Sequence, residues 1–412
     1  MNLPSRVLVL GLARSGQAAA LALRRRGVEV VGIDTSPAIA VGRLAEAGVE
    51  LHLGTEEEPL LDGVETVIKS PGVPAEAPLV AAARREGIPV WSEVELGSRL
   101  LPNPIVGITG TNGKTTTSEL LGVMLGAPVA GNVGRALTSL DGEVEPEELV
   151  VCEVSSFQLE DVHEFRPRVA VLLNLEPDHL DRHGSFEAYR DAKLRLFENQ
   201  GEGDTAIVPR GFGTVPGLAR RVEFAADEPL PAEPRIPGAH NRENAAAATA
   251  AARALGIDDA RIGEALETFP GVAHRLEPVA ELDGVRYVND SKATNTAAAR
   301  RAVAAFDAPL HIILGGQGKG ESYGELAGAL AGRARRAYLI GEAAAEIGDA
   351  LDAAGVAHEQ SGDLATAVRS AAANARPGEI VLLAPACTSY DQFRDFEERG
   401  EAFRRLVEEL AR

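Results

Sequence analysis

The chain has 412 residues, of which 45% are apolar and 25% charged, and its formal net charge is −20. This length predicts two or three domains, and because no apolar run approaches the roughly 18 residues of a membrane helix, we expect no membrane span. The acidic balance argues against a nucleic-acid or anionic-membrane surface, and the only cysteines, Cys152 and Cys387, indicate a reducing compartment, the cytoplasm.

Short Val, Ile and Leu runs alternate with alanine-rich, helix-forming stretches along the whole sequence. This alternation predicts an α/β fold in which parallel sheets are covered by helices. In the first part of the chain we expect strands at 6–13, 28–34 and 65–69, and a helix, "QAAALALRRRG", that ends at Gly27. These elements predict a Rossmann-like domain over residues 1–92.

The loop "GLARSG" at residues 11–16 follows the first expected strand. It is similar to a dinucleotide-binding fingerprint, with Ala13 at the second glycine, where a missing side chain lets the backbone approach a pyrophosphate. Asp34, at the end of the second strand, could accept hydrogen bonds from a ribose. The loop alone leaves two interpretations open, an NAD-dependent dehydrogenase and a tight strand-to-helix turn without a ligand.

The second part of the chain begins with "PNPIVGIT", continues through the strands "LVVCEV" and "RVAVLLNL", and closes on the helical "NRENAAAATAAARALG". These segments predict a parallel sheet with helices, as in P-loop ATPases. We expect this central domain to span residues 93–271, with the pair Pro270 and Gly271 as a hinge.

The stretch "GITGTNGKTTT" in this domain ends like a phosphate-binding P-loop but lacks glycine at the first position of the standard pattern. Gly110 and Gly113 can turn backbone N–H groups toward an anion at the start of the next helix, where the helix dipole also favours negative charge. Lys114 would then reach the terminal phosphates, and the hydroxyl of Thr115 would face Mg²⁺. The position between a strand and a helix predicts that this loop binds the phosphates of a nucleotide.

Two further side chains predict a metal site at the same edge of the central sheet. Glu153 ends the run "LVVCEV", and His179 lies just beyond the next strand, in "NLEPDHLDRHG". The carboxyl ends of parallel strands are where α/β sheets bind ligands, and hard cations take oxygen ligands, so Glu153 and Thr115 predict a Mg²⁺ site. A single glutamate after a strand is more often a solvated loop acid, so this prediction depends on its neighbours.

Lys193 belongs to an expected helix that begins after the N-cap Ser185. Positions 186, 189, 193, 196 and 197 share one stripe at about 100° per residue, which places this lysine among apolar side chains. Its stem could lie along the core and carry the charge out to solvent. Alternatively, the amine is directed at a phosphate or chemically modified, since burial favours the neutral, nucleophilic form.

The last part of the chain carries the expected strands "VRYVND", "LHIILGG", "RAYLIG" and "EIVLLAP", followed by a polar C-terminal helix. We expect a second Rossmann-like domain over residues 272–412.

Six motifs together resemble the ATP-dependent Mur ligases: "TGTNGKTTT", "NLEPDHLDRHGSFEAYRDAKLRLF", "GAHNRENAAAA", "HRLE", "NDSKATN" and "APACTSYDQFRDFEERGEAF". They occur in the family's order over nearly the whole chain, and the unusual start of the P-loop is itself the family's form. The last two motifs resemble the branch that adds D-glutamate.

The resemblance implies three domains: one for a UDP-sugar substrate, a central ATPase, and a mobile C-terminal domain that closes over the site. It implies an amide ligase of peptidoglycan precursor synthesis that joins D-glutamate to UDP-N-acetylmuramoyl-L-alanine through an acyl phosphate and releases ADP and phosphate. The implied cofactors are ATP and two Mg²⁺ ions. The expected partners are these small molecules, without nucleic acid or membrane, and the enzyme is expected to be a monomer.

Carried over by position, Lys114 and Thr115 handle the β/γ-phosphates and the first Mg²⁺, with Glu153 as that ion's second protein ligand. His179 binds the second Mg²⁺, and Lys193 matches a lysine that the family carbamylates with CO₂, which turns an amine into an anionic oxygen ligand. The other implied nucleotide contacts are Gly110, Thr111, Asn112, Gly113 and Thr116 in the loop, Asn241 and Asn244 beside adenine, and Arg275 and Asp290 on phosphate and ribose.

The resemblance also implies contacts to the two substrates that are joined. Asn132 and Ser155 match substrate and phosphate contacts near the reacting carboxylate. The implied D-glutamate contacts are Thr294, Lys319, Ser389 and Phe396, and the implied uridine contacts are Arg14, Ser15, Asp34, Thr35, Ser70, Pro71 and Gly72.

Two other classes of function explain fewer residues. A dehydrogenase with NAD on the first loop leaves Lys114, Thr115 and Glu153 unexplained, and a non-catalytic nucleotide switch leaves the lysine and aromatic residues of the last domain without a use. Inside the family, the alternatives are a ligase that adds L-alanine or a diamino acid, or one that adds glutamate to folate. "NDSKATN" favours the D-glutamate branch, because other members carry different residues there.

Overall fold

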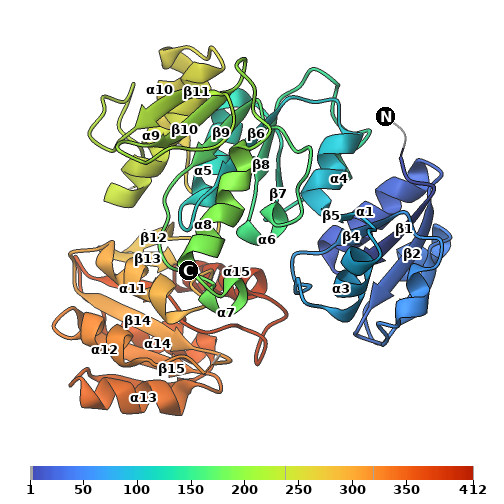
Figure 1. Ribbon diagram of the computed structural model, residues 1–412. Coiled ribbons are helices and arrows are strands. Elements are labelled where there is room, and N and C mark those ends of the chain that lie inside the picture. The colour runs from blue at the N-terminus through green and yellow to red at the C-terminus, as the bar shows by residue number, and fades with distance from the viewer. Residues whose placement is uncertain (1–2, 237, 319, 412) are drawn as a thin grey trace. The chain divides into compact units, whose positions relative to one another are not determined.

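The computed structural model describes residues 3–236, 238–318 and 320–411. The chain forms two compact units, the first comprising Met1–Arg235 with Ala239–Phe269, and the second Ile236–Gly238 with Pro270–Arg412. Strands and helices alternate throughout, and the strands form three sheets (Figure 1). The predicted α/β class is therefore confirmed. No helix in the described part of the chain is long and apolar enough to cross a bilayer.

The N-terminal sheet has five parallel strands in the order β3-β2-β1-β4-β5. Alternate residues of β1 face opposite cores, with Val7 and Val9 in the core formed with α1, and Leu8 and Leu10 in the core formed with α3. Helices therefore cover both faces of this sheet. Its elements are β1 (Arg6–Leu10), α1 (Arg14–Arg25), β2 (Glu29–Asp34), α2 (Gly42–Glu46), β3 (Glu50–Leu53), β4 (Thr66–Lys69), α3 (Pro78–Arg85), β5 (Val90–Ser92) and α4 (Glu93–Leu100).

The central sheet, in the same unit, has six parallel strands in the order β11-β10-β9-β6-β8-β7. Its middle strands β9, β6 and β8 are neighbours, so the loops at their carboxyl ends lie at one edge. The elements are β6 (Ile105–Thr109), α5 (Lys114–Leu125), β7 (Val129–Gly131), β8 (Val150–Glu153), α6 (Ser156–Leu159), β9 (Val169–Leu172), α7 (Leu180–His183), α8 (Phe186–Leu194), β10 (Thr205–Pro209), β11 (Arg220–Phe224), α9 (Ala239–Ala254) and α10 (Asp259–Thr268).

The second unit contains a six-stranded sheet in the order β12-β13-β17-β14-β15-β16, in which β12 is antiparallel to β13 and the other pairs are parallel. Its elements are β12 (Glu277–Leu282), β13 (Val285–Asn289), α11 (Thr296–Ala304), β14 (Leu310–Gly315), α12 (Gly324–Leu330), β15 (Ala334–Ile340), α13 (Ala344–Ala353), β16 (His358–Gly362), α14 (Leu364–Asn374), β17 (Ile380–Leu383) and α15 (Phe396–Leu410).

Element boundaries differ from the expectations mainly at the first turn. The first strand ends at Leu10, not at residue 13, because Gly11 has a φ of 85° and begins the turn into α1. The helix begins at Arg14 and its last regular residue is Arg25, with Gly27 in the left-handed conformation just beyond it. The predicted helix end at this glycine is confirmed.

Candidate active site at the edge of the central sheet

The predicted phosphate loop connects the buried strand β6 to helix α5, as its sequence position indicated. Gly113 precedes the helix with a φ of 83°, and a Cβ atom added there would lie 2.1 Å from the Asn244 side-chain oxygen. A Cβ at Gly110 would lie 2.9 Å from the Cβ of Leu173. The two glycines are therefore required by close packing of the loop against α9 and against the end of β9.

Lys114, the first residue of α5, folds back over this loop. Its Nζ donates hydrogen bonds to the carbonyl oxygens of Gly110 (2.8 Å) and Thr111 (2.9 Å). Thr115 and Thr116 follow in the first turn and are buried. The lysine amine is thus held beside the helix N-terminus, where backbone N–H groups and the helix dipole favour an anion.

Asn174, just after β9, holds the loop in place, although it is not among the predicted site residues. Its Oδ1 accepts from the backbone N–H of Asn112 (2.8 Å), its Nδ2 donates to the carbonyl of Asn112 (3.2 Å), and its carbonyl accepts from the N–H of Thr111 (3.1 Å). Tyr189 adds a hydrogen bond between its hydroxyl and that of Thr111 (2.9 Å). The sequence feature that could have predicted this role is a polar amide that follows a run of apolar residues, at a sheet edge where such folds bind ligands.

Glu153 lies at the carboxyl end of β8, opposite Ile108 of β6, and its side chain is 1% exposed. Asn132 holds it in two ways: the side-chain Nδ2 donates to Glu153 Oε1 (2.9 Å), and the backbone N–H donates to the Glu153 carbonyl (2.8 Å). Glu153, predicted as a metal ligand, and Asn132, predicted as a substrate contact, are therefore in direct contact. The carboxylate is oriented before any ligand arrives.

Ser155 caps the short helix α6 directly after β8. Its Oγ accepts from the N–H of Gln158 (3.3 Å), and Gln158 Oε1 accepts from the N–H of Ser155 (3.0 Å), a reciprocal capping box. This predicted substrate contact is thus fixed by the fold at the same sheet edge as Glu153.

Lys193 is on helix α8, which begins after the N-cap Ser185 as predicted. The lysine is 2% exposed, and its Nζ donates to the Gly110 carbonyl (2.8 Å) and the Thr109 hydroxyl (3.4 Å). Burial, together with the charge of Lys114, lowers the pKa of Lys193 to about 6. The interpretation in which the stem carries the charge out to solvent is therefore wrong. Both lysine amines meet at one carbonyl of the P-loop.

His179 precedes helix α7 in the left-handed conformation, with a φ of 51°. Its ring packs edge-on against Phe157 with centroids 4.9 Å apart, and its Nε2 lies 3.6 Å from a carboxylate oxygen of Asp178. The imidazole is about half exposed, with 50% of the side chain accessible. It lies near Tyr189, with ring centroids 6.5 Å apart, and so belongs to the same edge as Lys193.

The predicted magnesium ligands suit a site that is completed by phosphate. Among the described residues, no group of three or more His, Cys, Asp or Glu side chains could hold a metal ion by itself. Mg²⁺ keeps several waters and is usually held by one or two carboxylates together with substrate phosphates. The oriented Glu153 carboxylate and the Thr115 hydroxyl at the P-loop have the chemistry of such a partial site.

The two predicted adenine contacts, Asn241 and Asn244, are buried in the first turns of α9. Asn244 Nδ2 lies 3.5 Å from Asn241 Oδ1, and the Asn244 amide packs directly against Gly113. The structure therefore brings both side chains next to the phosphate loop.

The expected uridine contacts gather at the carboxyl edge of the N-terminal sheet, where β1, β2 and β4 are neighbours. Asp34 Oδ2 accepts from the N–H of Leu12 (2.7 Å), and Ser70 Oγ donates to the Gly11 carbonyl (2.6 Å). A Cβ at Gly16 would lie 1.9 Å from the Gly11 carbonyl oxygen, so this glycine serves the tight turn itself. The others follow the same strand ends: Arg14 and Ser15 in the first turn of α1, Thr35 after β2, and Pro71 and Gly72 after β4.

Arg182, which the sequence analysis also missed, connects α7 to the loop after β4. Its guanidinium donates to the carbonyls of Pro71 (2.7 Å) and Val73 (2.9 Å) and lies 3.9 Å from the ring centroid of Phe157. The predicted uridine loop and the segment that carries His179 are therefore joined by one side chain. The sequence feature that could have pointed to Arg182 is a charged residue in the short segment that follows His179.

In the second unit, Asp290, Thr294, Ser389 and Phe396 follow β13 or β17, which are adjacent strands, and Arg275 precedes β12. Asp290 is buried and accepts from the N–H of Leu276 (3.1 Å), and burial raises its pKa to about 6. Arg275 stands beside Leu276, whose φ of 44° is strained for a non-glycine residue. Thr294 lies in the loop after β13, Ser389 is buried in the loop after β17, Phe396 begins α15, and Lys319 lies outside the described residues.

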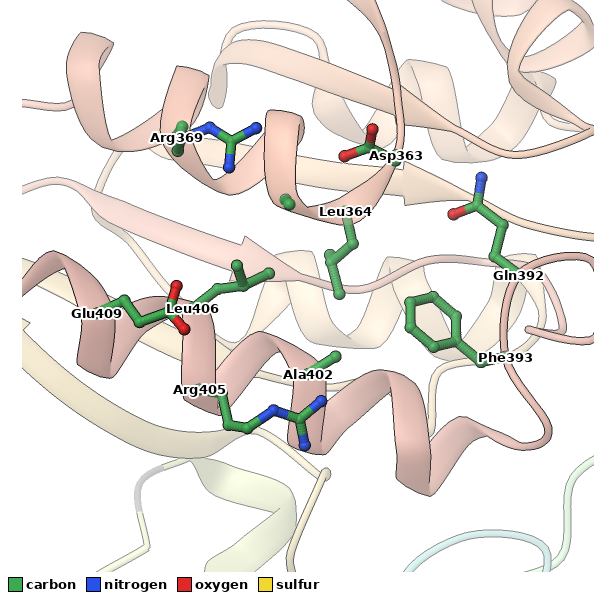
Figure 2. A pocket seen from close by; sticks show the side chains of 10 residues that line it. Asp363, Leu364, Arg369, Gln392, Phe393, Ala402, Arg405, Leu406 and Glu409 are labelled. Carbon is green, nitrogen blue, oxygen red and sulfur yellow. The ribbon is translucent and has the colours of Figure 1, made fainter.

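A separate hollow of about 580 Å³ lies between α14 and α15 of the second unit (Figure 2). Its floor is apolar, with Leu364, Phe393 and Leu406, while Arg369 and Arg405 belong to its charged rim. None of the predicted site residues lines it. The residues predicted to bind substrates or to catalyse the reaction therefore lie outside this hollow.

A glycine-lysine loop between a parallel strand and a helix is typical of P-loop nucleotide-binding proteins. Three family models match the chain: Mur ligase MurD-like, N-terminal domain, over residues 5–92; Mur ligase middle domain, over 108–213; and Mur ligase, glutamate ligase domain, over 274–387. The chain belongs to the Mur ligase family. It is therefore an ATP-dependent ligase that forms an amide bond.

Relatives over nearly the full length carry one description. The chain is 42% identical to the UDP-N-acetylmuramoylalanine--D-glutamate ligase of Pelotomaculum thermopropionicum over 441 residues, covering 98% of this chain and 97% of that protein. It is 45% identical to the protein of the same name from Sphingopyxis alaskensis over 433 residues, with 98% and 97% covered.

Solved structures of the family share the fold. UDP-N-acetylmuramate-alanine ligase MurC from Thermotoga maritima matches with a TM-score of 0.61 at 20% identity, covering 98% of this chain and 99% of that one. The MurF ligase from Thermotoga maritima, solved in complex with ADP, matches with a TM-score of 0.60 at 18% identity, covering 93% and 96%.

Proposed function

We propose that this enzyme joins D-glutamate to UDP-N-acetylmuramoyl-L-alanine at the expense of ATP, a step of peptidoglycan precursor synthesis. One observation carries the proposal: 98% of the chain aligns at 42% identity with a protein named as that ligase. The gathering of Lys114, Glu153 and Lys193 at one sheet edge supplies the groups that such a reaction requires.

The reaction needs phosphate because a carboxylate is a poor acyl donor. An oxygen of the alanine carboxylate attacks the γ-phosphorus of ATP, the bond to the β-phosphate oxygen breaks, and ADP leaves. The amine nitrogen of D-glutamate then attacks the acyl carbon, the carbon–oxygen bond to phosphate breaks, and the amine loses a proton. The products are the amide, ADP and phosphate.

The phosphates of ATP bind at the N-terminus of α5 in this proposal. Backbone N–H groups of the loop, held by Asn174, supply preformed donors, and the Lys114 amine can turn from two carbonyls toward the β/γ-phosphates. Arg275 and Asp290 take phosphate and ribose. The nucleotide contacts are Gly110, Thr111, Asn112, Gly113, Lys114, Thr115, Thr116, Asn241, Asn244, Arg275 and Asp290.

Thr115 and Glu153 would hold a first Mg²⁺, and His179 and Lys193 a second. Bound Mg²⁺ offsets negative charge on the phosphates and on the substrate carboxylate. An ammonium cannot be a ligand, so Lys193 acts as a carbamate, formed when its neutral amine adds CO₂ and releases a proton. Two features support this: the amine is buried, and the nitrogen of a carbamate would keep one N–H that can donate to the Gly110 carbonyl.

Asn132 and Ser155 position the reacting carboxylate beside Glu153. The uridine end binds at the edge of the N-terminal sheet, and Thr294, Lys319, Ser389 and Phe396 bind D-glutamate. Because ATP and UDP-sugars are intracellular metabolites and both cysteines are buried free thiols, we place the reaction in the cytoplasm. The proposed enzyme acts as a monomer.

The test supplies enzyme, Mg²⁺, ATP and UDP-N-acetylmuramoyl-L-alanine, and measures phosphate release after D-glutamate, L-glutamate or L-alanine is added. We expect release with D-glutamate alone, with one ADP formed per amide. Formation of AMP and pyrophosphate, or equal release without an amino acid, would contradict the proposal. Preference for another amino acid would support a different ligase of the same family.

A further inference from the structure

Arg399, in the first turn of α15, is 0% exposed. By residue volume, its side chain is the largest that is fully buried among the described residues. It is not among the predicted site residues, although it lies in the last of the six motifs, "APACTSYDQFRDFEERGEAF". A buried guanidinium costs free energy unless its hydrogen-bonding capacity is satisfied. Its surroundings therefore indicate what it does.

Four hydrogen bonds connect the guanidinium to two loops. Nε donates to the Ser291 hydroxyl (2.9 Å), and Nη2 donates to the Ser291 carbonyl (2.9 Å) and to the Cys387 carbonyl (3.1 Å). Nη1 donates to the Thr388 carbonyl (3.2 Å). Ser291 lies in the loop after β13, and Cys387 and Thr388 lie in the loop after β17, the neighbouring strand.

A third loop joins the same arrangement. Gln317, after β14, forms a two-way backbone bridge with Thr388, with N···O distances of 3.0 and 3.1 Å. A Cβ at Gly316 would lie 3.2 Å from Arg399 Nη1, so this backbone packs against the guanidinium. Strands β13, β17 and β14 are consecutive in the sheet. Arg399 therefore lies where three loops at the carboxyl edge meet.

Neutral groups accept all four hydrogen bonds of this guanidinium. No ion pair among the described residues includes Arg399, and its four acceptors are three carbonyls and one hydroxyl. Burial lowers its pKa to about 10, while the negative charge of Asp391 acts to raise this pKa, so the arginine remains charged at neutral pH. A planar fork with five donors can satisfy all four acceptors at once, whereas a lysine ammonium has only three donors.

We propose that Arg399 is the positioning residue of the amino-acid site, acting through the backbone of the loops that carry Thr294 and Ser389. This inference rests on the proposed function, which places D-glutamate on those loops. Ser291 extends the same network, because its hydroxyl also donates to the carbonyl of Phe396 (2.8 Å). Loss of the guanidinium leaves the loops attached to their strands but lets their tips shift relative to one another.

The experiment compares wild type, R399K, S291A and the control R405K, which changes an exposed arginine of the same helix. The KM values for D-glutamate, ATP and UDP-N-acetylmuramoyl-L-alanine are measured with the melting temperature. We expect KM for D-glutamate to rise at least tenfold in R399K and at least threefold in S291A. The other KM values should stay within twofold, and R405K should match wild type in all of them.

Two results would overturn the inference: a KM for D-glutamate within twofold of wild type in R399K, or an equal rise in all three KM values. If R399K does not fold, S291A decides by the same criterion. If wild type uses a different amino acid, the proposed function fails, and the comparison is made with that amino acid. A failure of one proposal is thus distinguishable from a failure of the other.

Discussion

Replacing Gly113 by alanine tests whether the P-loop and α9 form one nucleotide site. The change adds a single Cβ atom at a residue whose φ is 83°. Gly142 offers a matched control, because its φ is 82° and no atom lies within 4 Å of an added Cβ. The backbone cost is therefore the same at both positions, and only Gly113 has a neighbour in the way.

The magnitude has two parts. A left-handed conformation costs an alanine about 1–2 kcal/mol, so both variants should lose about that much unfolding free energy. At Gly113 the new Cβ would also lie 2.1 Å from the Asn244 oxygen, more than 1 Å inside the roughly 3.5 Å of an ordinary contact. Because this oxygen ends a side chain, the amide rotates away, and the proposed contact to adenine is lost with little further loss of stability.

The assay measures urea unfolding and the KM for ATP in both variants. We expect equal losses of stability and a KM for ATP that rises about tenfold in G113A, equivalent to about 1.4 kcal/mol, and less than twofold in G142A. If both variants bind ATP alike, Asn244 does not contribute to the nucleotide site and the reasoning is refuted.

Three other substitutions address the remaining groups. K193A should lower turnover at least a hundredfold while nucleotide binding persists, and short carboxylic acids in the buffer should restore part of it; unchanged turnover would contradict the role of this lysine. Burial raises the pKa of Asp290 from 3.8 to about 6, so the folded protein binds this proton more tightly than the unfolded chain does. The resulting contribution of Asp290 to the free energy of unfolding is complete below about pH 4 and is lost as the pH rises through 6. Wild type should therefore lose up to about 3 kcal/mol of unfolding free energy across this range relative to D290N, and parallel urea titrations of the two proteins would contradict this. R182A should raise the KM for the UDP-substrate severalfold without changing that for ATP, because the loop after β4 loses two hydrogen bonds; equal changes for both substrates would point to a general loss of structure.

The sequence predicted the interior strands of the three sheets, with the exception of β10, and missed the strands at their edges. Every strand expected from the sequence is an interior strand, while β3, β5, β7, β11, β12 and β16 are edge strands that were not expected. Interior strands of parallel sheets are buried on both faces and appear as continuous apolar runs. Edge strands such as β16, with the sequence "HEQSG", are partly exposed and polar, so hydrophobic patterning does not distinguish them from loops.

The candidate site likewise contains some residues that local sequence patterns predict and others that they do not. The P-loop, Glu153 and the burial of Lys193 followed from strand ends and helical spacing, which are local properties. Asn174 and Arg399 could not be found in this way, because Asn174 bonds to Asn112, 62 positions away, and Arg399 connects its own segment to Ser291, 108 positions away. Residues that support a site through the backbone of distant loops carry no local pattern, and only the folded chain shows which carbonyls they reach.

The acceptors of Arg399 have one more consequence. Three of the four are main-chain carbonyls, which every amino acid possesses. Apart from Ser291, whose hydroxyl is the fourth acceptor, the side chains of these loops can therefore be exchanged without removing the hydrogen bonds that hold the loops in place. Libraries that randomise these side chains while retaining this arginine offer a route to ligases that accept other amino acids.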